Sequence, residues 1–121
     1  MAKPKAGLII LNWNGKKDTL ECLESVSKSK TTSIKLNTIV VDNASTDNSV
    51  NSIKKHFPEI NLIQNNYNLG FAAGNNVGIK QALSDKCEVI ILLNNDTTVT
   101  PDTFENLFQG ANQSGFDIAS P

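Results

Sequence analysis

The chain has 121 residues, a length that suits one domain built around one hydrophobic core. Hydrophobic residues make up 39% of the chain and its formal net charge is −1, which excludes the composition of a disordered chain and that of a basic nucleic-acid-binding protein. All eleven basic residues are lysines, so a phosphate group would be met by a metal ion, lysine, amides or backbone N–H groups, without an arginine fork. No apolar run reaches the roughly 18 residues of a membrane helix, and the first apolar stretch is too short for a secretory signal. We therefore expect a cytoplasmic protein with at most peripheral membrane association.

The first half of the chain alternates apolar strands with amphipathic helices. Residues 6–12 form a continuous apolar run, which is typical of a strand buried on both faces. Apolar residues then recur at three-residue spacing and predict a helix over 16–28. A second strand is predicted over 34–42, followed by a helix that Asp47 caps and Pro58 ends.

The second half repeats this alternation. In chain order we predict a short strand at 60–64, a polar loop with glycines at 65–76, a helix through 77–83, a strand at 88–94, a helix opened by Pro101 and the start of a fifth strand at 115–121. Strands and helices in this order predict one α/β domain with a Rossmann-like parallel sheet and right-handed crossovers.

Polar side chains gather where the predicted strands end. They lie at 12–14, 42–43, 65–76 and 94–98. Ligands of parallel α/β sheets bind beyond the carboxyl ends of the strands, so these clusters predict one shared binding edge that is rich in amides and poor in charge.

Two acids at this edge each have two interpretations. Asp96 is either a ligand of a divalent metal, completed by substrate phosphates, or a residue that forms the turn after the strand. Asp42 either accepts hydrogen bonds from a ribose hydroxyl or base N–H, or forms an Asx turn.

The neighbouring residues are equally open to two interpretations. Trp13 either stacks on a ligand or packs at a strand end, while Asn12 and Asn14 either orient a ligand or bond the loop backbone. The glycines at 70, 74 and 78 either let a helix approach a phosphate or allow close packing of a helix on the sheet. The two cysteines are predicted to be small buried residues, and no G-x-G-x-x-G motif supports a dinucleotide site.

Four stretches together, "IILNWNG", "VVDNASTDNS", "NLGFAAGNNVGI" and "ILLNNDTTV", resemble the family 2 glycosyltransferases, in particular rhamnosyltransferase-like members. The resemblance extends from Gly7 to Phe108. It implies the A-type glycosyltransferase fold, of which residues 1–121 would be the nucleotide-sugar-binding half, truncated before the acceptor-binding half.

The resemblance also implies roles for individual residues. Asn12, Trp13 and Asn14 would line the nucleotide pocket, and Asp42, followed by Asn43, would read the base or ribose. Further residues implied to bind the donor are Gly70, Phe71, Asn75 and Asn76, which would close over the nucleoside, and Asn94 and Asn95. Asp96 matches the last acid of the D-x-D motif, which holds a divalent metal, Mn²⁺ or Mg²⁺, and Asn94 stands where the family has the first acid.

The implied reaction transfers a sugar with inversion from a nucleoside-diphosphate sugar to a hydroxyl of a saccharide or lipid-linked acceptor, as in polysaccharide biosynthesis. The catalytic base would lie in the second half, so we expect these 121 residues to bind donor but to transfer sugar slowly or not at all. A dinucleotide-dependent oxidoreductase module and a non-catalytic scaffold are the alternatives. The sequence identifies neither the donor nor the acceptor.

Overall fold

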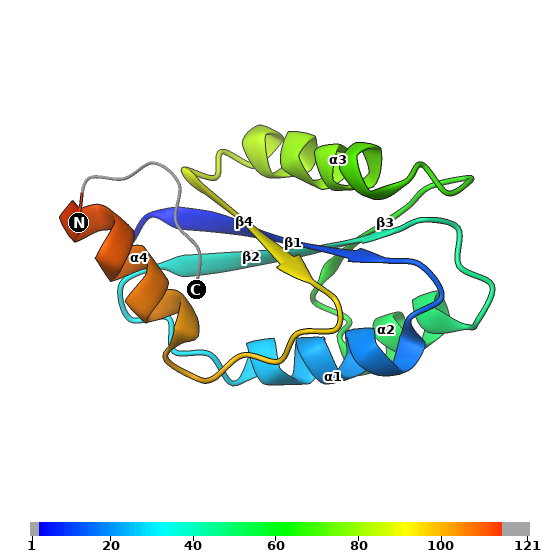
Figure 1. The fold of residues 1–121 in the computed structure, drawn as a ribbon, viewed down its shortest axis with the longest axis horizontal. Helices are drawn as coiled ribbons and strands as arrows, with labels where there is room; N and C mark the ends of the chain where they lie inside the picture. Colours follow the sequence, from blue (N-terminus) through cyan, green and yellow to red (C-terminus); the bar gives the residue numbers. More distant parts are fainter. Residues whose placement is uncertain (1–2, 115–121) are drawn as a thin grey trace.

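The computed structural model describes residues 3–114, in which strands and helices alternate strictly (Figure 1). The strands are β1 (Lys5–Asn12), β2 (Lys35–Asp42), β3 (Asn61–Gln64) and β4 (Val89–Asn94), and the helices are α1 (Lys16–Ser27), α2 (Ser49–His56), α3 (Phe71–Ser84) and α4 (Thr103–Ser114). Each of the four strands lies within one residue of its predicted bounds. The predicted start of a fifth strand at 115–121 lies outside the described residues.

The four strands form one parallel sheet in the order β3-β2-β1-β4. β1 pairs with both β2 and β4, and this central position explains why Leu8, Ile9 and Ile10 are fully buried in succession. In the register of the sheet, Asn12 pairs with Asp42. The polar ends of β1 and β2 therefore lie side by side.

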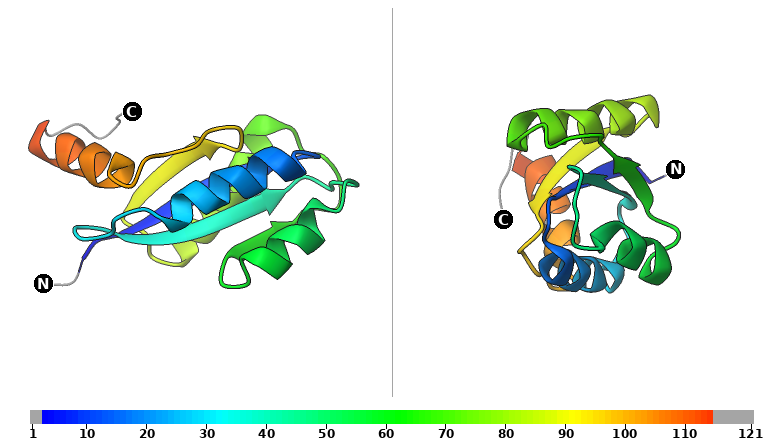
Figure 2. Two further views of the ribbon diagram at one scale, coloured as in Figure 1. Left: turned by 90° about the horizontal axis from the view of Figure 1, so that it is seen from below. Right: turned by 90° about the vertical axis from the view of Figure 1, so that its right-hand side faces the viewer.

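Helices cover both faces of the sheet, as the end-on view in Figure 2 shows. Leu8 and Ile10 point toward α1 and α2, where they join a core that includes Leu23. Ile9 points the other way, into a smaller core with Ala82 of α3. This alternation follows from the two-residue period of a strand.

Helix α3 begins at Phe71, so the prediction of a loop through residue 76 was wrong. Gly74, Gly78 and Ala82 form a stripe of small residues four apart that packs directly on the sheet. A Cβ added to Gly78 would lie 2.6 Å from Ile9 Cγ2, and one added to Gly74 would lie 2.6 Å from Leu11 Cδ1. The glycines lower the helix propensity of the segment, and the close packing that they allow outweighs it. For Gly74 and Gly78 the structure thus supports the packing interpretation.

Helix α4 is attached to the segment that precedes β2. Its Phe104 is buried in the core on the α1 side, and Glu105 Oε1 accepts a hydrogen bond of 2.7 Å from the N–H of Ser33. Lys30 Nζ lies 3.0 Å from a carboxylate oxygen of Asp102. The helix begins at Thr103, two residues after the proline that was predicted to open it.

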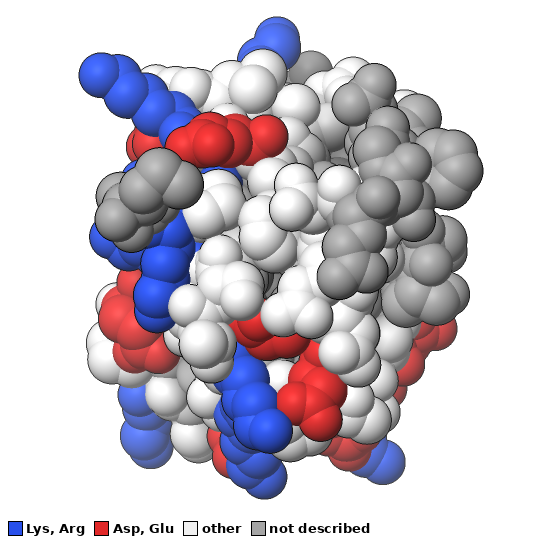
Figure 3. Space-filling model, turned by 90° about the vertical axis from the view of Figure 1, so that its left-hand side faces the viewer, with Lys and Arg blue, Asp and Glu red and all other residues white. Residues whose placement is uncertain are grey.

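The edge of the molecule opposite the strand ends carries charges of both signs. Figure 3 shows lysines and acids interspersed there, with uncharged residues between them. Such mixing agrees with the near-neutral net charge and differs from the single-sign surface that nucleic-acid backbones select. Within residues 3–114, no helix has both the length and the apolar character needed to cross a membrane.

Candidate functional site

The strand order places a crevice at the carboxyl ends of β1 and β4. The chain leaves β1 toward β2 on one side and later returns to add β4 on the other, which makes this the switch point of the sheet. Leu11 pairs with Asn94 across the two strands. Trp13 and Asn95 are the first residues after β1 and β4, so the two loops meet at the same edge.

A cavity of about 210 Å³ opens at this point. The residues that line it are Leu11, Trp13, Phe71, Asn75, Leu92, Leu93, Asn94 and Asn95. Five of the twelve residues predicted to bind a nucleotide sugar are thus in its wall. The mixture of aromatic rings, aliphatic groups and amides is typical of a site for an uncharged, ring-containing part of a ligand.

Two aromatic rings are exposed in the cavity wall. Trp13 is 56% exposed and Phe71 is 66% exposed, and they come from the loop after β1 and from the first turn of α3. Trp13 therefore does not pack in the core, which was the alternative interpretation of this residue. Exposed rings that face a cavity offer stacking surfaces for a base or a sugar.

Asp42 is buried beside the cavity and does not line it. Its Oδ1 accepts hydrogen bonds from Asn12 Nδ2 and the Ser45 hydroxyl, both at 2.7 Å, and its Oδ2 accepts one of 2.9 Å from the N–H of Ser45. The carboxylate thus bonds the turn that follows β2, as the second interpretation of this acid held, but at the third residue onward and not at the second, as in an Asx turn. A carboxylate has about four acceptor positions, so one position on Oδ2 remains for a further donor.

Asn43 connects the end of β2 to the start of α3. Its Nδ2 donates to the carbonyl oxygen of Gly70 at 3.1 Å, and its Oδ1 accepts from Asn65 Nδ2 at 2.9 Å. Gly70 has φ +84°, a value that L-residues rarely adopt, and α3 begins directly after it. Asn43 thus fixes the position from which Phe71 reaches the cavity.

Three other predicted residues lie outside the cavity wall. The Asn14 side chain accepts a hydrogen bond of 2.7 Å from the N–H of Thr46 and so joins two loops. Asn76 is exposed on α3, one residue after the lining Asn75. Asp96 is also exposed, and it directly follows the lining Asn95.

The Asp96 carboxylate is near Cys22 of α1. Burial, and secondly the negative charge of Asp96, raise the pKa of the Cys22 thiol to about 11. Cys22 therefore stays protonated at neutral pH and serves as a small buried residue, as predicted for both cysteines.

The residues around Asp96 fit a divalent cation that is shared with a ligand. One carboxylate and the amide oxygens of Asn94 and Asn95 are hard oxygen donors of the kind that Mg²⁺ and Mn²⁺ accept. Within residues 3–114, no group of three or more His, Cys, Asp or Glu side chains could hold a metal without further ligands. Phosphate oxygens and water would have to complete the coordination, which is the usual case for Mg²⁺.

Two contributors, half-buried Ser45 and fully buried Thr19, were not predicted from the sequence. Ser45 completes the hydrogen bonds around Asp42, and Thr19 of α1 bonds both Asn12 and Asn95. Thr19 falls four residues before Leu23 and seven before Val26, so the three-residue and four-residue spacing that revealed the buried face of the helix also marks Thr19 as a buried polar residue.

The sheet order, the helices on both faces and the crevice at the switch point define an α/β nucleotide-binding fold of the A-type glycosyltransferase class. Residues 8–121 match the family model "Glycosyl transferase family 2". The chain belongs to this family, as its four sequence motifs predicted. No curated protein matches it at a significant level.

Solved structures with the same fold include TarS of S. aureus and the mannosyltransferase PcManGT of Pyrobaculum calidifontis. TarS has a TM-score of 0.74 at 22% sequence identity, over 92% of this chain and 20% of TarS. TarS 1–349 in complex with UDP-GlcNAc has a TM-score of 0.74 at 24% identity, over 90% of this chain and 31% of that one. PcManGT in complex with GDP-Man and Mn²⁺ has a TM-score of 0.76 at 22% identity, over 92% of this chain and 33% of that one. The chain thus spans a fifth to a third of the length of these proteins.

Proposed function

We propose that residues 1–121 are the donor-binding half of an inverting, metal-assisted glycosyltransferase that uses a nucleoside-diphosphate sugar. The observation that carries the proposal is the cavity at the switch point, which Trp13 and Phe71 line together with Asn94 and Asn95, the two residues that precede Asp96. The complexes of TarS 1–349 with UDP-GlcNAc and of PcManGT with GDP-Man support this class of ligand.

Each part of the donor meets a different part of the site. The rings of Trp13 and Phe71 stack on the base or the sugar, and the lining amide of Asn75 hydrogen-bonds its polar groups. The free acceptor position on Asp42 Oδ2 accepts a hydrogen bond from an O–H or N–H group of the nucleoside. Asp96, with the amide oxygens of Asn94 and Asn95, would hold Mn²⁺ or Mg²⁺, which would supply positive charge to the diphosphate.

The metal, when bound, offsets the negative charge that grows on the departing diphosphate. The oxygen of the acceptor hydroxyl, on a saccharide or a lipid-linked saccharide, forms the new bond to the anomeric carbon while the bond to the diphosphate breaks on the opposite side. We assign no residue of this chain as the base that takes the hydroxyl proton, and we propose that these 121 residues bind donor with little or no sugar transfer. The products of such a reaction serve polysaccharide assembly.

Calorimetric titration tests the proposal. UDP, GDP and dTDP are titrated into the chain with and without Mn²⁺, and NAD is titrated in parallel. We expect heat from at least one nucleoside diphosphate and a clear gain in its affinity when Mn²⁺ is present. Binding of NAD alone would favour an oxidoreductase module, and the absence of heat throughout would favour a scaffold that binds no nucleotide.

A further inference from the structure

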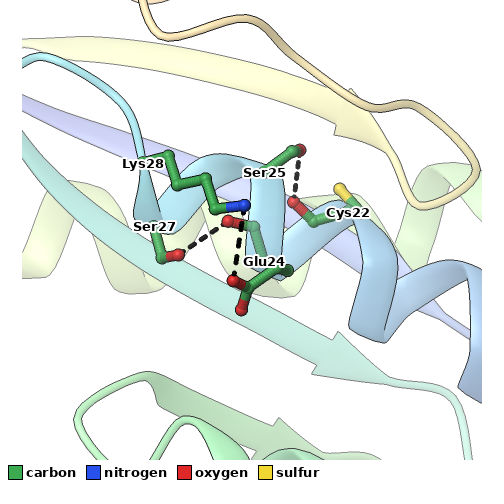
Figure 4. A network of polar contacts seen from close by, with 5 residues as sticks. All are labelled: Cys22, Glu24, Ser25, Ser27 and Lys28. Atoms are coloured by element: carbon green, nitrogen blue, oxygen red, sulfur yellow. Dashed lines mark hydrogen bonds and ion pairs between the residues drawn. The ribbon is translucent and has the colours of Figure 1, made fainter.

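One face of α1 contacts the segment that carries Asp96. The Thr19 hydroxyl accepts a hydrogen bond of 3.0 Å from Asn95 Nδ2, the Cys22 thiol points at the carbonyl oxygen of Asn94 at 3.9 Å, and the Ser25 hydroxyl accepts one of 3.1 Å from the N–H of Val99. The three α1 residues are three apart and therefore share one side of the helix. Figure 4 shows Cys22 and Ser25 on that side, away from the Glu24–Lys28 ion pair.

Thr19 also begins a chain of hydrogen bonds that crosses the sheet to Asp42. Its hydroxyl donates to Asn12 Oδ1 at 2.7 Å, and Asn12 Nδ2 donates to Asp42 Oδ1 at 2.7 Å. Four side chains, from the turn after β4, from α1, from β1 and from β2, are therefore joined in series from Asn95 to Asp42.

The direction of this chain is fixed by chemistry. An ionised carboxylate only accepts, so Asn12 must turn its NH₂ group to Asp42 and its oxygen to Thr19. The Thr19 hydroxyl therefore donates its single hydrogen to Asn12 Oδ1, and its oxygen accepts a hydrogen bond from Asn95 Nδ2. Thr19 and Asn12 are 0% exposed, so water does not compete for these bonds and successive bonds polarise one another.

We propose that Thr19 is a positioning residue that couples the nucleoside end of the donor site, at Asp42, to the metal end, at Asp96. The inference rests on the proposed function, because the two ends are those of one nucleoside diphosphate. Asn95 directly precedes Asp96, so the bond from Thr19 holds the turn that presents this carboxylate. Without that bond the Asn95 side chain loses its anchor on α1, the Asp96 carboxylate is held less firmly, and a metal ion bound there strengthens diphosphate binding less.

The test compares the gain in affinity that Mn²⁺ gives in wild type and in variants at Thr19. Affinity is measured by calorimetry, for whichever of UDP, GDP and dTDP wild type binds most tightly. We expect Thr19→Val to lower the Mn²⁺-dependent gain in nucleotide affinity about tenfold. This change corresponds to about 1.4 kcal/mol, which is the size expected for the loss of one buried hydrogen bond. Thr19→Ser keeps the hydroxyl and should stay within about twofold of wild type. Thr31→Val makes the same exchange at an exposed position before β2 and should also leave the gain unchanged.

A double-mutant cycle separates positioning from general loss of structure. If Thr19 acts through Asn95, then Thr19→Val combined with Asn95→Ala lowers the gain no further than Asn95→Ala alone. Circular dichroism confirms that each variant is folded at the titration temperature, and Thr19→Ala, which also removes the hydroxyl and leaves Asn95 intact, replaces Thr19→Val should that variant fail to fold.

The outcomes distinguish this inference from the proposed function. Wild type that binds none of the three nucleotides overturns both. Wild type that shows the Mn²⁺-dependent gain, with a Thr19→Val variant that retains it, overturns the role of Thr19 alone. Additive effects of Thr19→Val and Asn95→Ala overturn it as well.

Discussion

The close packing of α3 on the sheet predicts that one methyl group destabilises the protein at Gly78. An alanine Cβ there would lie 2.6 Å from Ile9 Cγ2 and 3.1 Å from Val41 Cγ2, well inside the roughly 3.5–4.0 Å of a favourable carbon contact. Both neighbours are fully buried on adjacent strands. Overpacking of this kind costs about 2–3 kcal/mol, and the better helix propensity of alanine returns about 1 kcal/mol. We therefore expect Gly78→Ala to lower the free energy of unfolding by about 1–2 kcal/mol, and the melting temperature by roughly 5 °C.

Gly110→Ala is the matched control, because it makes the same exchange within a helix where space is free. No atom lies within 4 Å of a Cβ added to Gly110 in α4. The propensity gain is then unopposed, and we expect an increase in stability of about 0.5–1 kcal/mol. Urea unfolding followed by circular dichroism measures both variants. A Gly78→Ala variant as stable as Gly110→Ala would refute the argument that the small-residue stripe sets the distance of α3 from the sheet.

Two further predictions concern the cavity and the turn after β2. Phe71→Ala should weaken binding of the preferred nucleoside diphosphate by about tenfold, as expected for one lost stacking ring, whereas Leu83→Ala, at another exposed apolar position of α3, should leave the calorimetric affinity unchanged. Burial raises the pKa of the Asp47 carboxyl, but hydrogen bonds from the Ser49 hydroxyl and from the N–H groups of Lys16 and Ser49 outweigh it and hold the pKa below its ordinary value. The stability that Asp47 contributes is therefore complete above the unfolded pKa of about 3.9 and is lost as the pH falls through the lower folded value. Asp47→Asn should thus have a lower free energy of unfolding in urea than wild type at pH 7, and the difference between the two proteins should shrink toward pH 2. An equal difference in the free energy of unfolding at both pH values would contradict this prediction.

The sheet could be predicted from the sequence because its signals are strong and local. Residues 6–11 and 89–93 are apolar throughout, which is typical of the strands of a parallel sheet. The start of α3 could not be predicted in the same way. Gly74 fell in the predicted loop, and the packing interpretation of Gly74 and Gly78 could be chosen only once their close approach to Leu11 and Ile9 of β1 was known.

The location of the candidate site could be predicted from the sequence, but the role of each residue in it could be predicted less well. The ends of the predicted strands identified the edge of the sheet at which the cavity lies. The exposure of Trp13 depends on how the loop after β1 packs beside Phe71 of α3, which is far away in the sequence. Asp42 had two interpretations, and its bonds to Ser45 show that it supports the turn after β2 while one acceptor position stays open for a ligand. Thr19 escaped notice because its partners, Asn12 and Asn95, are brought together only by the pairing of β1 with β4.

The most direct test of the account uses Trp13, the single tryptophan of the chain, as its own reporter. Its fluorescence is followed while UDP and GDP are added with and without Mg²⁺, in wild type, in Asp96→Asn and in Asp102→Asn, a control that exchanges another exposed acid. We predict a saturable change at one nucleotide, a higher affinity with Mg²⁺ in wild type and Asp102→Asn, and loss of the Mg²⁺ effect in Asp96→Asn. An unchanged Trp13 signal with both nucleotides, or an equal Mg²⁺ effect in Asp96→Asn, would contradict the assignment of this cavity as a metal-assisted nucleotide-sugar site.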